Sequence, residues 1–192
     1  MFKLFSKKEK VDLPLKETIT EKFVLNKLNN FQNEETPIED ILVPFLNSYY
    51  KNVEFEKLNA EEKKEVFSKY VLSLNSIQRN LDLITRYFAT VAEGGAGHFE
   101  YFRYDGNEYT ELLKALSEID LIDFANILKE AKGIIDSSNY DNDLEKHGLE
   151  LFSKVDAKFY DLYYNTYKKG GINQQKIIRY IKDNLSSLIC KD

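Results

Sequence analysis

The sequence predicts an all-α, or nearly all-α, fold: a single multi-helix domain with a glycine- and aromatic-rich break between its central helices. Three observations support this prediction. Apolar residues recur every three to four positions over most of the chain, which is the period of an amphipathic helix. With 43% hydrophobic and 31% charged residues, the 192-residue chain has the composition of one globular domain. Helix-capping patterns precede several of the periodic segments.

The chain divides into three parts. Residues 1–16 are expected to form a basic, flexible N-terminal tail and linker. Residues 17–58 form an N-terminal helical segment, and residues 59–192 form the main helical domain. We expect the last two parts to pack together as one globular unit.

Two helices are expected within the N-terminal segment. Helical spacing runs over Thr18–Phe31, which opens with a capping box. Pro37 is suited to the first turn of a second helix, and Pro44 predicts a kink or break in it. The alternation in Lys51–Leu58 fits either a short strand or a loop.

The middle of the chain predicts four helices. Asn59 caps the first of two helices that share the range Ala60–Val91, with a bend near Asn75–Asn80, where middling or poor helix formers gather. Beyond the glycine break, periodic segments predict helices over Asn107–Ile119 and Asp120–Ile135.

The C-terminal part predicts a loop followed by two helices. The polar run Asp136–Asp143 is typical of a surface loop. Helical spacing returns over Leu144–Tyr164, and Gly170 with Gly171 then ends the helical segment. A last helix is expected over Asn173–Ile189.

The net charge of −5 is unevenly distributed. Residues 93–161 hold 16 acidic and 7 basic side chains, whereas the rest of the chain holds 16 acidic and 20 basic ones. A cationic protein surface is one expected partner of such a segment, and an ordinary solvated surface is the alternative. Direct binding of nucleic acid is not expected, because the basic residues are scattered and form no stripe.

Other features bear on the compartment. Cys190 is the only cysteine, which excludes an internal disulfide and indicates a reducing compartment, so we expect a cytoplasmic protein. No run approaches the roughly 18 apolar residues of a membrane span. The start, MFKLFSKKEK, is not followed by the apolar stretch of a secretory signal.

No motif predicts a catalytic residue, a metal site or a cofactor. GxSxG, P-loop and HExxH patterns are absent from the sequence. The run Gly94–Gly97 lacks the preceding strand and the following Lys-Ser/Thr of a phosphate-binding loop. His98 has Glu93, Glu100 and Asp105 near it in sequence, but one histidine among acids is more often an ordinary packed or surface residue.

The glycine-aromatic break is interpreted mainly as architecture. Glycines let the chain leave one helix in a positive-φ turn, and we expect the rings that follow to fold back as a plug across the helix ends. A ligand pocket lined by the same rings is the alternative. The residues expected to be structural are Gly94, Gly95, Gly97, Phe99, Tyr101, Phe102, Tyr104 and Gly106.

Several segments resemble a known family in the same order along the chain. They are Tyr87–Val91, His98–Phe102, Asp105-Gly106, Ala115–Asp120, Val155–Tyr160 and Arg179–Asn184. With these segments the sequence resembles the DNA-mimic-protein-like bacterial domain family over Ala60–Ile189. Glu100 stands where that family usually has Gln, and Asp120 stands where it usually has Gly.

The resemblance implies a non-enzymatic helical protein that acts by protein contact. The family takes its name from a dimeric member whose acidic side chains imitate DNA phosphates and occupy a DNA-binding regulator. By analogy, the expected partner is a basic protein surface, either of a regulator or of a toxin to be neutralised, and a homodimer is also expected. The candidate contact residues are Glu108, Glu111, Glu118, Asp120 and Asp123.

Two other hypotheses remain open from the sequence. The first is a small-molecule-binding or enzymatic domain that uses the aromatic-lined break around His98 and Glu100. The second is a purely structural dimer.

Overall fold

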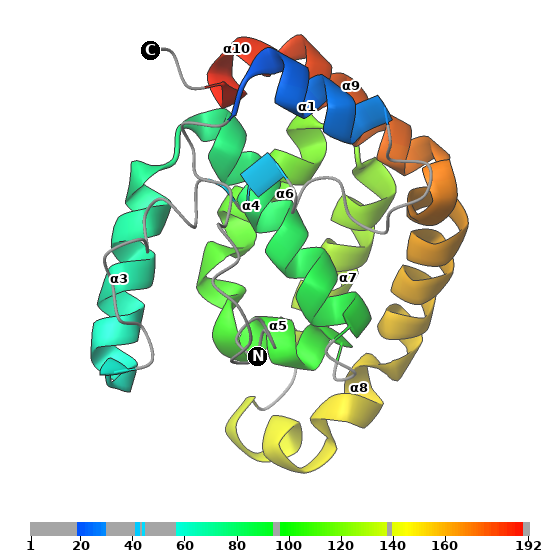
Figure 1. Cartoon of the computed structure of the whole chain (residues 1–192). Helices are drawn as coiled ribbons and strands as arrows, with labels where there is room; N and C mark the ends of the chain where they lie inside the picture. Colours follow the sequence, from blue (N-terminus) through cyan, green and yellow to red (C-terminus); the bar gives the residue numbers. More distant parts are fainter. Residues whose placement is uncertain are drawn as a thin grey trace.

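The computed structural model describes residues 19–29, 41–42, 44, 57–93, 97–137 and 140–189 (Figure 1). Every regular element within these ranges is a helix, which confirms the all-α prediction. Three predictions fall wholly or largely outside these ranges: the tail, the helix opened by Pro37 with its kink at Pro44, and the strand or loop over Lys51–Leu58.

The α-helices are joined by short π and 3-10 segments. In chain order the elements are α1 (Glu21–Asn29), α3 (Ala60–Ser73), α4 (Ser76–Phe88), the π-helix η4 (Ala89–Glu93), α5 (Gly97–Tyr104), the 3-10 turn η5 (Gly106–Glu108), α6 (Tyr109–Glu118), α7 (Ile122–Ser137), α8 (Tyr140–Leu162), the π-helix η6 (Tyr163–Tyr167), the 3-10 turn η7 (Lys168–Gly170), α9 (Ile172–Asp183) and α10 (Leu185–Leu188).

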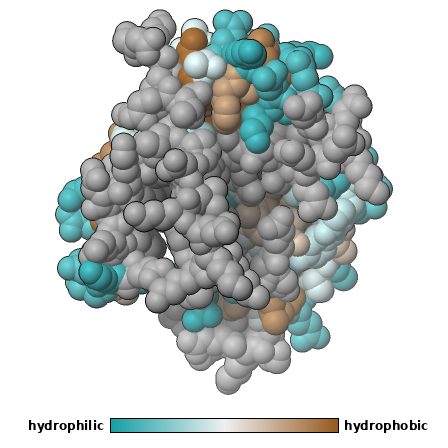
Figure 2. Space-filling model, in the orientation of Figure 1, coloured by the Kyte–Doolittle hydropathy of each residue, from teal (hydrophilic) through white to brown (hydrophobic). Residues whose placement is uncertain are grey.

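Helix α4 is the central element of the bundle. It packs against α6, while α8 packs against both α5 and α7 (Figure 1). Helices α1, α9 and α10 lie together at one end of the bundle, and α3 lies at its side. Figure 2 shows that hydrophilic side chains gather over the α1–α9 end on this face.

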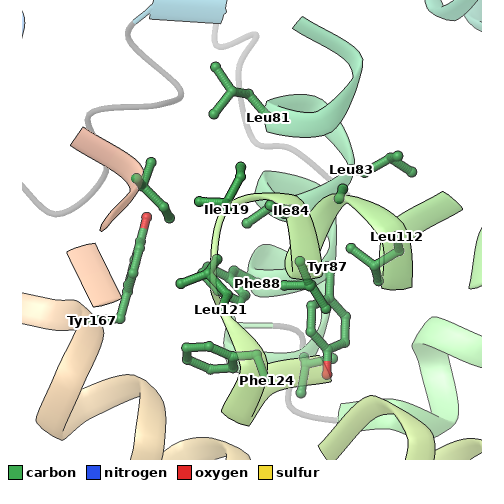
Figure 3. Close-up of a cluster of buried hydrophobic side chains, with 14 of the residues drawn as sticks. Leu81, Leu83, Ile84, Tyr87, Phe88, Leu112, Ile119, Leu121, Phe124 and Tyr167 are labelled. Carbon is green, nitrogen blue, oxygen red and sulfur yellow. The ribbon is translucent and has the colours of Figure 1, made fainter. Parts of the chain in front are cut away.

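The core is rich in aromatic rings. Phe88 of α4 lies at its centre: its ring centroid is 4.7 Å from that of Phe124 and 4.8 Å from that of Tyr167. Rings at such separations and tilted angles attract one another beyond their burial alone. Figure 3 shows buried aliphatic residues of the same core, which come from α4, α6 and the α6–α7 junction: Leu81, Leu83, Ile84, Leu112, Ile119 and Leu121.

Local capping explains where α3 and α4 begin. The Asn59 side chain accepts hydrogen bonds from the backbone of Glu61 and Glu62, and the Glu62 carboxylate accepts one from the Asn59 backbone. Asn75 forms the same reciprocal capping box with Gln78. The predicted division of Ala60–Val91 into two helices is therefore confirmed, because Asn75 starts a new helix at the predicted bend.

Some predicted boundaries are wrong. The run Asp136–Asp143 is no simple loop, because α7 extends to Ser137 and α8 begins at Tyr140. Packing of α8 along α7 outweighs the weak helix propensity of these polar residues. The predicted helix Asn173–Ile189 is two helices, α9 and α10, which meet at Asn184. The predicted helix Asn107–Ile119 begins in a 3-10 turn.

Within the described ranges, no helix combines the length and the apolar character needed to cross a membrane.

Candidate functional site

A row of alternating charges lies where α5 meets α6, facing α4. The Arg86 Nη1 atom donates to Asp105 at 3.0 Å, and its Nη2 lies 2.6 Å from Glu108. Arg79 contacts the other oxygen of Glu108 and donates to Glu111 at 2.9 Å. We call Asp105, Arg86, Glu108, Arg79 and Glu111, in this order, the charge row.

A further carboxylate lies behind the charge row. Asp82 accepts hydrogen bonds from both Arg79 and Arg86, each at 3.1 Å, and all three residues lie on α4. Positions three and four apart share one face of a helix, which explains why these side chains meet. Arg86 also lies over the ring of Phe67, with 5.4 Å to the centroid, and so connects α3 to the row.

Burial and the neighbouring arginines shift the pKa values of these carboxylates in opposite directions. Burial raises the pKa of Asp82 and of Asp105, and the charge of Arg86 only partly offsets it. Burial acts in the same direction on Glu108, but there hydrogen bonds from Arg79 and Arg86, together with their charges, outweigh it. The pKa of Glu108 is therefore lowered.

Two of the predicted contact residues belong to the charge row and differ in their exposure to solvent. Glu108 is mostly buried, with both of its oxygens facing guanidinium groups, so it is primarily part of the internal network. The Glu111 side chain is 63% exposed and meets Arg79 with one oxygen only. Of these two residues, Glu111 is the one that presents charge to solvent.

Glu118 is held at the other end of α6. The Tyr180 hydroxyl donates to it at 2.9 Å and accepts from Asn80 at 2.9 Å. Burial and the neighbouring Glu118 carboxylate raise the pKa of Tyr180 to about 12. Helices α4, α6 and α9 are thus connected through the Tyr180 hydroxyl.

Asp120 closes α6 in a left-handed conformation, with φ of 62°. Its backbone N–H donates to Ser117, and that of Leu121 donates to Leu116 at 2.8 Å, which are the two bonds of a Schellman motif. This position favours glycine, which accounts for the Gly usual at this point of the family pattern. The Asp120 side chain is 71% exposed and lies 3.1 Å from Lys176 Nζ.

The five predicted contact residues form two groups. Asp123 is exposed in the first turn of α7, close in sequence to Glu118 and Asp120. Glu108 and Glu111 lie at the N-terminal side of α6, and the seven residues from Glu111 to Glu118 span about 10 Å at 1.5 Å of rise per residue. Of the five, Glu111, Glu118, Asp120 and Asp123 are exposed, and the last three lie at or just beyond the C-terminal end of α6.

A buried hydrogen-bonded array lies beyond the charge row. The Tyr87 hydroxyl lies 2.7 Å from His98 Nε2, and His98 Nδ1 lies 2.6 Å from Asp156 Oδ1, which also accepts from the His98 backbone at 3.0 Å. A carboxylate can only accept, so Nδ1 carries the proton; in the neutral ring Nε2 then accepts from Tyr87. The array joins α4, α5 and α8.

This array gives His98 a structural role. Both of its ring nitrogens are occupied, and its side chain is fully buried, so neither nitrogen is free to contact a substrate. Its carboxylate partner is Asp156, not Glu100. Among the described residues, no group of three or more His, Cys, Asp or Glu side chains is arranged to hold a metal ion.

The glycine-aromatic break contains the helix α5. The prediction that its rings fold back as a plug across the helix ends is therefore wrong. The rings lie on α5, where Tyr101 and Phe102 are buried in the core and Phe99 is partly buried. Tyr104, in contrast, is 65% exposed. Helical spacing directs Tyr104 away from the face that packs on α8.

The glycines of the break have specific roles where the structure describes them. Gly97 has a φ of 59°, as predicted for a positive-φ turn, and a Cβ atom there would overlap the Asp156 carboxylate. Gly106 packs against the ring of Phe102. Gly94 and Gly95 fall outside the described residues.

Sequence reasoning missed the residues that organise both clusters. Arg79, Asp82 and Arg86 read as ordinary surface charges, although their spacing of three and four beside the apolar stripe of α4 was a usable signal. The pairing of His98 with Asp156 joins residues 58 positions apart, and no local pattern predicts it.

The model of a protein family described as "DMP19-like protein" matches residues 72–184. No curated protein and no solved structure matches the chain. The matched range contains the charge row, the buried histidine array and all five predicted contact residues.

Proposed function

Because this chain belongs to the DMP19-like protein family, whose name refers to a DNA mimic, we propose that it is a non-enzymatic interaction protein that presents an acidic helical face to a basic partner. The partner would be a DNA-binding regulator or a toxin, met in the cytoplasm. Homodimerisation remains part of this proposal.

The observation that carries the proposal is the group of exposed acidic residues at the C-terminal end of α6 and the start of α7. Glu118, Asp120 and Asp123 are all exposed there, in a segment whose acidic residues outnumber its basic ones by more than two to one. Carboxylates near a helix N-terminus are favoured by its dipole, which suits Asp123 at the start of α7. Arranged charges of one sign raise the association rate with a surface of opposite sign.

The geometry also supports different roles for the five candidate residues, some in direct contact with the partner and one acting indirectly. In the described part of the chain, Glu118 contacts Tyr180 and Asp120 contacts Lys176, which fixes their positions without burying them. Glu108 would act indirectly by holding the arginines of the charge row. We therefore assign the direct contacts to Glu111, Glu118, Asp120 and Asp123.

Capture on immobilised protein tests the proposal. Bound proteins are identified for the unaltered chain and for a Glu118→Lys/Asp123→Lys double variant in low salt. The proposal expects a basic protein on the first and little of it on the second. Glu61→Lys, at an exposed position of α3 outside the matched range, is the control that should retain the partner. Equal capture by the double variant and the control would reject the acidic face.

A further inference from the structure

Two exposed isoleucines lie beside the acidic residues at the C-terminal end of α6. Ile172 is 67% exposed and Ile122 is 45% exposed. Ile172 lies one turn before Lys176 on α9, so the two side chains share a face of that helix. Ile122 follows Asp120 by two residues, and Asp120 pairs with Lys176. Both isoleucines are therefore neighbours of one ion pair, although they come from different helices.

The contacts between the end of α6 and α9 follow one row of α9. Glu118 meets α9 at Tyr180, and Asp120 meets it at Lys176, one turn nearer to its start. The next position of this row is Ile172. Single exposed apolar residues are ordinary on a protein surface, but here the two isoleucines continue a row of acidic contacts. They give the acidic end of α6 an apolar part.

Lys176 shows which chemical group this surface accepts. Its ammonium donates to the Asp120 backbone carbonyl at 2.7 Å and lies 3.1 Å from the Asp120 carboxylate. Cations are favoured there because the last carbonyl groups of α6 carry the negative end of the helix dipole. The surface also contains two further carboxylates and the two isoleucines. We call the following residues the α6–α9 patch: Glu118, Asp120, Ile122, Asp123 and Ile172.

The N-terminal tail, residues 1–16, has the chemistry that complements the α6–α9 patch. It contains five lysines and two acidic residues. Its first eight residues, MFKLFSKK, combine three lysines with the apolar side chains of Phe2, Leu4 and Phe5 and contain no acid. Such a segment can place ammonium groups on the carboxylates of the patch while its apolar side chains cover the isoleucines.

The tail is long enough to reach the patch within the same chain. The first described residue, Ile19, is fully buried, and α1 packs against α10 at the end of the bundle where α9 also lies (Figure 1). The patch is about one length of α9 from α10, which is about 18 Å at 1.5 Å of rise per residue. The 18 residues that precede Ile19 can span up to about 60 Å.

We propose that the tail docks on the α6–α9 patch of its own chain and occupies the acidic face until the basic partner displaces it. A segment tethered by a short linker has an effective concentration on the order of 1 mM. A contact with an intrinsic dissociation constant of about 1 mM is then occupied about half of the time. The apparent affinity for the partner falls about twofold as a result, because only the unoccupied fraction can bind it.

Paramagnetic broadening of backbone amide signals tests the contact in the full chain. A nitroxide is attached at position 6 of a Ser6→Cys/Cys190→Ser chain, which leaves no other thiol. In low salt we expect strong broadening over residues 118–123 and 172–176 and little on α3. The broadening should fall about threefold or more at about 500 mM salt, because the exposed charges are screened.

Two pairs of substitutions in the nitroxide-bearing chain test the two kinds of contact. Lys7→Glu/Lys8→Glu should reduce the broadening about threefold or more. Ile122→Ser/Ile172→Ser should do the same by removing the apolar part of the patch, and the fold should tolerate it because both side chains are exposed. Leu72→Ser is the matched control on α3, where the side chain is 83% exposed, and should leave the broadening unchanged.

Three outcomes would overturn the docking of the tail. The first is broadening that is absent or spread evenly over the surface, α3 included. The second is equal broadening in the isoleucine variant and in the Leu72→Ser control. The third comes from a mixture of an isotope-labelled chain without nitroxide and a nitroxide-bearing chain without label. Broadening in that mixture would place the tail on a second copy, whereas we expect none.

The docking of the tail is independent of the partner, and only the competition rests on the proposed function. If the broadening is absent while Glu118→Lys/Asp123→Lys still loses the partner, the docking is wrong and the acidic face stands. If the broadening is present while the partner ignores this charge reversal, the acidic face is wrong. If both stand, the partner should bind Lys7→Glu/Lys8→Glu about twofold more tightly than the unaltered chain.

Discussion

The Nδ1 atom of His98 lies 2.6 Å from Oδ1 of Asp156, and this contact fixes α5 against α8. The same carboxylate oxygen accepts the His98 backbone N–H. Replacing Asp156 with Ala leaves two buried donors unpaired, so we expect a loss of about 2–4 kcal/mol in the free energy of unfolding. Asp156→Asn keeps an acceptor oxygen and should lose clearly less. Urea unfolding of both variants measures this, and equal losses would contradict the array.

Gly97 is predicted to be irreplaceable for a steric reason. At its φ of 59° a side chain is strained, and a Cβ atom would overlap the Asp156 carboxylate. Gly97→Ala should therefore cost about 3 kcal/mol or more. Gly133→Ala is the matched control, because nothing lies within 4 Å of its Cβ position in α7. It should gain about 0.5–1 kcal/mol from helix propensity. Thermal melts that rank the two variants alike would refute this account.

Two carboxylates around the same arginines should respond to pH in opposite directions. The pKa of Asp82 is raised by burial, so the folded protein takes up a proton there before the unfolded chain does. Its contribution to the free energy of unfolding grows as pH falls from neutral toward the ordinary aspartate value of about 4. The pKa of Glu108 is lowered, so its contribution is present above the ordinary glutamate value and is lost as pH falls through its folded-state pKa.

Denaturant unfolding at several pH values checks both signs. The difference between the unaltered chain and Asp82→Asn should widen on acidification, whereas the difference from Glu108→Gln should narrow. If the two differences in the free energy of unfolding changed in the same direction with pH, the charge row would be held together by other forces.

Replacing Asp120 should affect the stability of the fold and the binding of the partner in different ways. Asp120 occupies a left-handed position that costs a non-glycine residue roughly 1 kcal/mol. Its pairing with Lys176 is largely exposed and offsets little of this cost. Asp120→Gly should therefore melt at the same temperature as the unaltered chain or higher, yet bind the basic partner more weakly because one exposed charge is lost. A variant that melts several degrees lower would contradict the Schellman geometry.

The sequence predicted those features that depend on neighbours along the chain. Asn59 caps its helix as predicted, and the predicted bend near Asn75–Asn80 is the point where Asn75 starts a new helix. The π-helices Ala89–Glu93 and Tyr163–Tyr167 were not predicted, since each is one irregular turn inside an otherwise continuous apolar pattern.

The candidate site was predictable only as a set of acidic residues. That Glu108 is internal and Glu118 external depends on where Arg79 and Tyr180 meet them across helices. Such contacts follow from the packing of α4, α6 and α9, which residue types alone do not fix. The family pattern did identify the positions of Gly97, Asp120 and Asp156, but not what those residues contact.

The measurement that tests the acidic face most directly is the dissociation constant of the captured partner at about 50 mM and about 500 mM salt. We expect the unaltered chain to bind at least about tenfold more weakly in the higher salt, because exposed charges are screened there. The Glu118→Lys/Asp123→Lys variant in low salt should bind no more tightly than the unaltered chain in high salt. A dissociation constant that changes neither with salt nor with charge reversal would contradict the account.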